Sequence, residues 1–212
     1  MGRKVIAIED TTLAEQRAVR AVGEILREQG MKALDMERVA RRSKVSRSFL
    51  YRRFQDLSGL LRRYSQTEEF WPSVDELLGD DRGEFEAMTP ARQIAHFFKK
   101  YLTAIRSRPA TLELLAWEGV EKNELFRVLD MVRERTALEY FEHMKADPPE
   151  DVDLTAVILF LAGAVHFLAV RSRDRLSLGG IDLSSEAGWQ RIEKTIDDLV
   201  LSALSEEAKK DC

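Results

Sequence analysis

Apolar residues recur three and four positions apart along most of the chain, in segments that Gly, Pro, Asp or Ser residues separate. This pattern predicts helices from Thr11 or Thr12 to Gln29, within 34–54, from Asp56 to about Phe70, from Thr89 to about Ile105, from Pro109 to Trp117, from Glu121 to about Lys145, over 154–170 and after Ser184 or Ser185. Loops are predicted at 79–88 and 147–151. With only five Pro and 11 Gly, the chain does not have the composition of a loop-rich β protein. The predicted fold class is all-α.

The stretch 34–54 predicts two short helices joined by a tight turn. Val39 and Ala40 lie on one face of the first helix, while Leu50 and Phe54 lie four apart on one face of the second. The remaining surface is basic and carries Arg41, Arg42, Lys44, Arg47, Arg52 and Arg53. A helix-turn-helix has this form, and its second helix enters the DNA major groove. An ordinary helical hairpin with a solvated charged face is the alternative.

Residues from about Arg17 to Leu61 resemble the N-terminal domain of TetR-type transcriptional regulators. The resemblance rests on Val39-Ala40, Ser43-Lys44-Val45-Ser46, Ser48-Phe49-Leu50-Tyr51, Arg53-Phe54 and Leu60-Leu61. The sequence departs from the family pattern where Lys44 replaces a turn Gly, Phe49 replaces a Thr and Leu57 replaces a Lys. A Lys that must adopt positive φ at the turn would cost on the order of 1 kcal/mol. The usual operator contacts therefore cannot be transferred unchanged to this chain.

The resemblance and the charge distribution agree on two functional parts. Residues 1–64 contain 15 Lys and Arg against 8 Asp and Glu, whereas the remainder contains 18 against 29. A basic head and an acidic body indicate that the head alone binds a polyanion. We therefore expect a three-helix DNA-binding domain at 1–56, with its motif at 34–53. An effector-binding and dimerisation domain is expected at 57–212.

The second helix of the motif is expected to supply most of the DNA contacts. Arg47 is the predicted base reader, because a guanidinium matches the O6 and N7 atoms of guanine. Phe49 is placed either against a thymine methyl or back onto the head, and the resemblance implies a phosphate contact for Tyr51. The predicted DNA-binding residues are Lys44, Ser46, Arg47, Ser48, Phe49, Tyr51, Arg52, Arg53 and Leu57.

Two apolar segments of the body predict a homodimer. Residues 154–170 contain no charged residue, and a helix that is apolar on every side is buried on every side in a soluble protein. The segment is at the lower length limit of a membrane span, which is the alternative, although no other stretch resembles it. The last helix has a seam typical of helix pairing. The predicted dimer interface consists of Leu161, Val165, Leu168, Trp189, Ile192, Ile196, Leu199 and Ala203.

Large aromatic residues on the body helices indicate an apolar effector pocket, an expectation that depends mainly on the family resemblance. Each of these aromatics is also a candidate for ordinary core packing. The predicted ligand-binding residues are Phe97, Tyr101, Trp117, Phe126, Phe141, Phe160, His166 and Phe167. The expected mechanism is a population shift, in which a small molecule favours a form of the body that weakens DNA binding.

No catalytic motif is recognisable in the sequence. It has no Gly-rich phosphate loop, no paired Cys motif and no Ser elbow, and its three histidines show no i, i+4 spacing. We therefore expect neither an enzyme nor a cofactor or metal. A single Cys and the lack of a signal-like start indicate a cytoplasmic protein. The alternative function is a helical dimeric interaction or carrier protein with a degenerate DNA-binding head.

Overall fold

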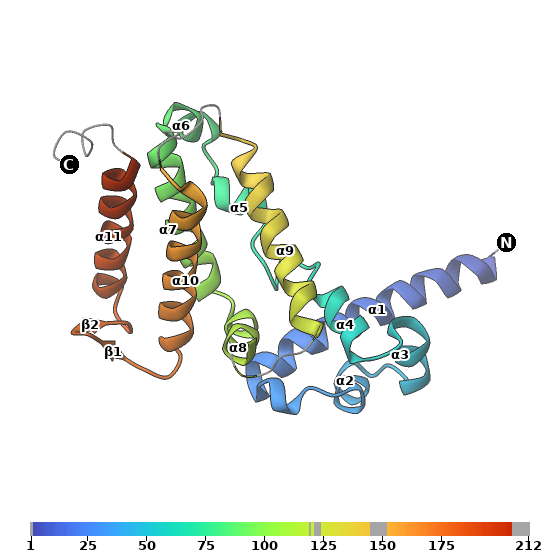
Figure 1. Cartoon of the computed structure of the whole chain (residues 1–212). Helices are drawn as coiled ribbons and strands as arrows, with labels where there is room; N and C mark the ends of the chain where they lie inside the picture. The colour runs from blue at the N-terminus through green and yellow to red at the C-terminus, as the bar shows by residue number, and fades with distance from the viewer. Residues whose placement is uncertain (1, 119, 121–123, 145–151, 205–212) are drawn as a thin grey trace. The chain divides into compact units, whose positions relative to one another are not determined.

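The computed structural model is built from helices, which confirms the predicted all-α class (Figure 1). It describes residues 2–118, 120, 124–144 and 152–204, and the side chains of all of these except 2–10 and 124–129. The helices in this part of the chain are α1 Gly2–Gln29, η1 Met31–Ala33, α2 Met36–Ser43, α3 Arg47–Phe54, α4 Leu57–Tyr64, α5 Val74–Leu78, α6 Arg82–Ala87, α7 Pro90–Arg106, α8 Pro109–Glu118, α9 Glu124–Phe141, α10 Leu154–Arg171 and α11 Glu186–Leu204.

Three features of the secondary structure correct the sequence prediction. The helix expected to reach Phe70 ends at Tyr64 as α4, and turns follow it. The segment predicted as a loop at 79–88 contains α6. A hairpin of β1 Ser177–Leu178 and β2 Ile181–Asp182 was not predicted, because strands of two residues show no periodicity. Its turn residues, Gly179 and Gly180, both have positive φ, as tight hairpin turns require.

The described residues pack into two compact units. Unit 1 consists of Met1–Trp71 and Arg108–Arg133, and unit 2 consists of Pro72–Ser107 and Glu134–Cys212. This division differs from the expected boundary after residue 56. The physical reason is that both α4 and α8 pack against α1, so they share a core with the helix-turn-helix.

The core of unit 1 forms around α1. Val22 and Ile25 of α1 are fully buried, and so are Leu50 of α3 and Leu60 of α4. Gly59 permits the close approach of α3 and α4, because a Cβ at this position would lie 1.9 Å from the carbonyl oxygen of Phe54. The start of α4 is therefore fixed closely against the end of α3.

The core of unit 2 forms around α7, against which α5, α10 and α11 pack. Phe98 and Leu102 of α7 are fully buried, and Trp189 of α11 is almost so. The indole Nε1 of Trp189 donates to the carbonyl oxygen of Leu183 at 2.8 Å. The guanidinium Cζ of Arg106 lies 3.9 Å from the centroid of a Trp189 ring. Burial lowers the pKa of Arg106, and the nearby acidic residues only partly offset this effect.

Candidate nucleic-acid interface and effector region

The helix-turn-helix is held by caps at both of its helices. The side chain of Asp35 accepts from the backbone nitrogen of Arg38 at 2.6 Å at the start of α2. Ser46 is the N-cap of α3, where its hydroxyl oxygen accepts from the backbone nitrogen of Phe49 at 3.2 Å. With their first turns fixed in this way, both short helices have defined directions.

Lys44 ends α2 in the left-handed conformation, with φ 56 and ψ 35. This confirms that the turn needs the positive φ for which the family uses Gly. The side chain of Lys44 is exposed, so its charge remains at the surface of the turn. The chain therefore has a strained backbone at this position and gains a cation beside α3.

The outer face of α3 carries the side chains expected to contact DNA. Its apolar residues, Leu50 and Phe54, are buried, whereas Arg47 keeps 60% of its side chain exposed. One Arg47 nitrogen lies 3.8 Å from Glu37, which is a weak contact for an exposed pair. Ser46, Ser48, Tyr51 and Arg52 are exposed, and Phe49 and Leu57 are half-buried. Arg47 is thus oriented away from the core.

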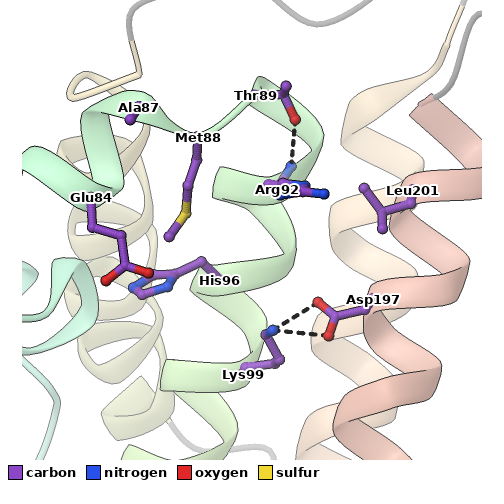
Figure 2. Close-up of a pocket in the computed structure, with 9 residues that line it drawn as sticks. All are labelled: Glu84, Ala87, Met88, Thr89, Arg92, His96, Lys99, Asp197 and Leu201. Atoms are coloured by element: carbon purple, nitrogen blue, oxygen red, sulfur yellow. Dashed lines mark hydrogen bonds and ion pairs between the residues drawn. The ribbon is translucent and has the colours of Figure 1, made fainter.

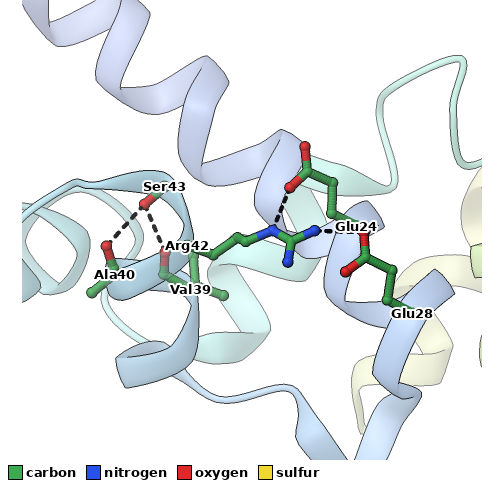
Figure 3. Close-up of polar contacts among 6 residues, drawn as sticks. All are labelled: Glu24, Glu28, Val39, Ala40, Arg42 and Ser43. Carbon is green, nitrogen blue, oxygen red and sulfur yellow. Dashed lines mark hydrogen bonds and ion pairs between the residues drawn. The ribbon is translucent and has the colours of Figure 1, made fainter.

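Arg42 does not belong to the free basic surface, because two acids of α1 hold it (Figure 3). Its Nε contacts Glu24 at 2.6 Å and its Nη2 contacts Glu28 at 2.5 Å. The hydrogen bonds of Glu28 and Glu24 raise the pKa of Arg42 above its ordinary value. The Ser43 hydroxyl donates to the carbonyl oxygen of Val39 at 2.7 Å. Arg42 therefore ties α2 to α1, a role that its place in a basic run did not indicate.

Arg53 is likewise held by an acid. Its Nε contacts Glu15 of α1 at 2.6 Å, and Nε of Arg63 on α4 contacts the other carboxylate oxygen at 2.9 Å. Each guanidinium thus contacts one oxygen of the Glu15 carboxylate, and only 12% of the Glu15 side chain is exposed. Glu15 therefore connects α1, α3 and α4. Sequence reasoning missed it, because its partners are 38 and 48 residues away.

A buried carboxylate attaches α8 to the end of α1. Glu113 is 7% exposed. It accepts from the backbone nitrogen of Met31 at 2.6 Å and from Nε1 of Trp117 at 3.0 Å. Gly30 has φ 78, and a Cβ there would lie 2.8 Å from the Glu113 carboxylate. The polar contacts of Glu113 thus fix α8 to the end of α1 within unit 1.

The structure brings together only some of the aromatic residues predicted to bind an effector. In unit 2, the ring of Phe97 stacks on Tyr101 and also lies near Phe141. The Tyr101 hydroxyl forms a hydrogen bond with Nε2 of His166. Phe160 and Phe167 point to the surface instead, with 73% and 55% exposed. Trp117 belongs to unit 1, and the side chain of Phe126 lies outside the described residues. Phe160 and Phe167 are therefore not buried together with Phe97 and Tyr101.

A pocket of about 530 Å³ opens between α6, α7 and α11 of unit 2 (Figure 2). Lys99 of α7 forms an ion pair with Asp197 of α11 at 2.8 Å on its wall. The His96 ring nitrogen Nε2 lies 3.2 Å from the carbonyl oxygen of Leu78. Burial lowers the pKa of His96, and the charge of Lys100 lowers it further. This polar pocket was not predicted, since its residues come from distant segments without a shared motif.

Burial also changes the expected dimer surface. Leu161, Val165, Trp189, Ile192 and Ile196 are buried inside unit 2 and are not available to a partner. Leu168 is half-buried, while Leu199 and Ala203 are exposed. Neither helix points its whole apolar surface outward, because one face of each packs against α7.

The exposed face of α10 is apolar. Leu159 and Phe160 are 68% and 73% exposed, and Gly163 and Phe167 follow on the same face. Over its 18 residues, α10 is long and apolar enough to cross a membrane, and 17% of it is buried within the chain.

No group of three or more His, Cys, Asp or Glu residues that could hold a metal ion occurs among the described residues.

Residues 20–64 match the family model described as bacterial regulatory proteins, tetR family. The match covers the last third of α1, from residue 20, and the whole of α2, α3 and α4. A comparison with curated proteins found no match.

Solved structures of regulators share the fold over most of the chain. The fatty acid degradation regulator FadR from Bacillus halodurans is 14% identical, with a TM-score of 0.59, covering 90% of this chain and 96% of its own. The regulator FadR from Bacillus subtilis, solved in complex with stearoyl-CoA, is 12% identical, with a TM-score of 0.61 and coverages of 90% and 99%. SCO3833 from Streptomyces coelicolor A3, a member of the TetR family, is 17% identical, with a TM-score of 0.51 and coverages of 89% and 91%.

Proposed function

We propose that the chain is a TetR-type transcriptional regulator, which binds a palindromic operator as a homodimer and is released when a small molecule binds its body. Repression is the proposed outcome of operator binding. The protein would act in the cytoplasm, where operator DNA is accessible.

One observation carries the proposal: α3 presents a polar and basic face while its apolar face is locked into the core. Leu50 and Phe54 are buried, and Arg47 remains largely exposed. A recognition helix must combine a fixed direction with free side chains that reach base edges. Arg47 is the proposed base reader, and Ser46, Ser48 and Tyr51 are the proposed phosphate contacts.

The exposed apolar face of α10 supports the homodimer. Leu159, Phe160 and Phe167 of α10 and Leu199 of α11 form uncovered apolar surface on helices whose other faces pack on α7. Contiguous exposed apolar surface on a soluble protein typically marks an interaction site. A second copy of the chain would supply the same apolar helices, and two pairs of such helices form a four-helix bundle.

A small-molecule effector is proposed for two reasons. The regulator from Bacillus subtilis, which shares this fold, was solved with stearoyl-CoA, and this chain contains an aromatic group at Phe97, Tyr101 and Phe141 with a polar contact to His166. Apolar walls with one or two polar groups suit a small organic molecule.

The contacts of unit 1 offer a path by which such a molecule would affect DNA binding. Glu113 fixes α8 to the end of α1, and Glu15 fixes α4 to α3. A displacement of α8 or α4 would therefore also displace the recognition helix α3, because these contacts connect the helices directly. By linkage, the operator would weaken binding of the effector by the same factor.

Selection of bound DNA from a random pool tests the proposal. A palindromic product with half-sites about 34–36 Å apart, or a multiple of this distance, is expected from a two-fold symmetric dimer. Retention of that product at roughly 0.2 M salt separates operator recognition from general attraction to phosphate. If no sequence is enriched, the alternative of a carrier protein with a degenerate head is favoured. The strained Lys44 is the observation that supports this alternative.

A further inference from the structure

Arg133 of α9 has two buried nitrogen atoms without a hydrogen-bond partner. Only 14% of its side chain is exposed. Its Nη1 contacts Glu118 at 2.8 Å and Asp130 at 3.3 Å. Its Nε and Nη2 have no partner, and no other buried side-chain nitrogen or oxygen lacks one in the part of the chain that the structure describes. A buried donor without an acceptor is unfavourable, so the two unpaired nitrogens of Arg133 are an exception among the described residues.

The two unpaired atoms form one edge of the guanidinium. In an arginine side chain, the N–H bonds of Nε and Nη2 point to the same side, and this edge receives an oxygen acceptor through two parallel hydrogen bonds. The Cζ atom of Arg133 lies 5.5 Å from the ring centroid of Trp71, which is 5% exposed. The Arg133 guanidinium therefore lies over a buried aromatic ring, and small-molecule sites commonly combine an aromatic wall with a few polar groups.

The surrounding charges favour an uncharged acceptor. Glu118 and Asp130 already bring two negative charges to the single positive charge of Arg133. A carboxylate at the unpaired edge would be attracted by the guanidinium of Arg133 and repelled by Glu118 and Asp130. Because the two acids would lie about twice as far from this carboxylate as Arg133 does, their combined repulsion would largely cancel the attraction. A carbonyl oxygen has two lone pairs for the two N–H groups and brings no further charge into a buried site.

We propose that the free edge of Arg133 binds the carbonyl oxygen of a small uncharged molecule, such as an ester, amide, ketone or lactone, and that Trp71 contacts its apolar part. The inference depends on the proposed function, because this molecule would be an effector bound in unit 1, whereas the aromatic group of Phe97 and Tyr101 belongs to unit 2. Arg133, Glu118 and Trp71 all belong to unit 1, which also contains the recognition helix. A molecule bound at this edge therefore contacts the unit that binds DNA.

The site also has a direct connection to α8. Trp71 follows Phe70, whose carbonyl oxygen accepts a hydrogen bond from Thr111 of α8. Glu118, the closest partner of Arg133, is the last residue of the same helix. A carbonyl compound bound at Arg133 and Trp71 would therefore lie beside two polar contacts of α8, one at Thr111 and one at Glu118.

The test measures binding of a defined panel of probes to the full-length protein. The panel consists of uncharged esters, amides, ketones and lactones of short and medium chain length, each paired with the ether or alkane without the carbonyl and with the matching carboxylate. At least one carbonyl probe should bind about tenfold or more tightly than its ether partner, as expected for a hydrogen bond to a charged donor. The variants Arg133→Met and Arg133→Lys should lose this preference and retain the affinity for the ether.

Arg133→Lys keeps a cation for Glu118 but lacks the fork, so it distinguishes loss of the site from a failure to fold. Its circular dichroism and operator binding without probe should match those of the parent. The proposal is overturned if no carbonyl probe is preferred by the parent protein, if carboxylates are preferred instead, or if Arg133→Lys keeps the carbonyl preference. If a carbonyl probe binds but operator affinity does not change, the site at Arg133 is supported and its role as an effector site is contradicted. If an operator is selected but no carbonyl probe is preferred, only the proposed site at Arg133 is contradicted.

Discussion

Nε of Arg53 on α3 lies 2.6 Å from the Glu15 carboxylate on α1, which joins the recognition helix to the core helix of unit 1. Arg63 shares the same carboxylate. Glu15→Gln should therefore destabilise the protein by about 1 kcal/mol, because two partly exposed ion pairs are weakened. Urea denaturation measures this change. Asp198→Asn is a matched control, since it removes only an exposed pair with Lys194 on one helix and should cost about 0.5 kcal/mol or less.

The effect of Glu15→Gln should depend on pH. Burial raises the pKa of Glu15, but the hydrogen bonds and charges of Arg53 and Arg63 outweigh it, so the pKa lies below its ordinary value of 4.5. A carboxyl with a lowered folded pKa stabilises fully above the unfolded value and loses that contribution as pH falls through the folded one. The stability difference between parent and variant should be constant above pH 4.5 and shrink below it. A difference that grows in acid would contradict the assigned pairing.

Arg47 and Arg52 should differ in how their loss affects DNA recognition. Arg47→Ala should weaken the selected operator by about 1–3 kcal/mol and relax one base position. Arg52→Ala should weaken all sequences alike and reduce the salt slope by about 1, as expected of a phosphate contact. Binding of both variants to the selected operator and to its single-base variants, over a range of salt, separates the roles. Equal effects of Arg47→Ala on every sequence would remove it as a base reader.

The helix-turn-helix could be predicted from the sequence because its determinants are local. The caps, the apolar faces and the positive φ at Lys44 each involve residues a few positions apart. The roles of Glu15, Glu113 and Arg133 could not be predicted, because their partners come from other helices. A charged residue in sequence gives no sign of whether a distant acid will pair with it.

The apolar helices of the body show the same limit. Periodicity correctly placed α10 and α11, but it could not determine which face packs on α7. Leu161 and Phe160 are neighbours in the same apolar run, yet the first is 4% exposed and the second 73%. Only the position of α7 decides which of them is available to a partner.

Lys44→Gly should stabilise the protein by about 0.5–1 kcal/mol, because Gly adopts positive φ without the steric cost of a Cβ. Lys44→Ala removes the same charge but keeps the Cβ, so it should give no such gain. The midpoints of urea unfolding compare the two. Equal stability of the Gly and Ala variants would show that the turn is not strained by its side chain. Both variants should also weaken DNA binding equally if only the charge of Lys44 contributes to it.

Phe160→Asp should convert the proposed dimer into a monomer. Phe160 is 73% exposed within one chain, so the substitution leaves the core of unit 2 intact while it places a charge on the apolar face of α10. Burying an unpaired charge in an apolar interface is strongly unfavourable. Leu176→Asp is the control, because Leu176 is 72% exposed but lies outside α10 and α11. Sedimentation should give a dimer for the parent and the control and a monomer for Phe160→Asp. The monomer should bind a single half-site at best, with a loss of affinity for the full operator. A dimeric Phe160→Asp variant would place the interface on another face.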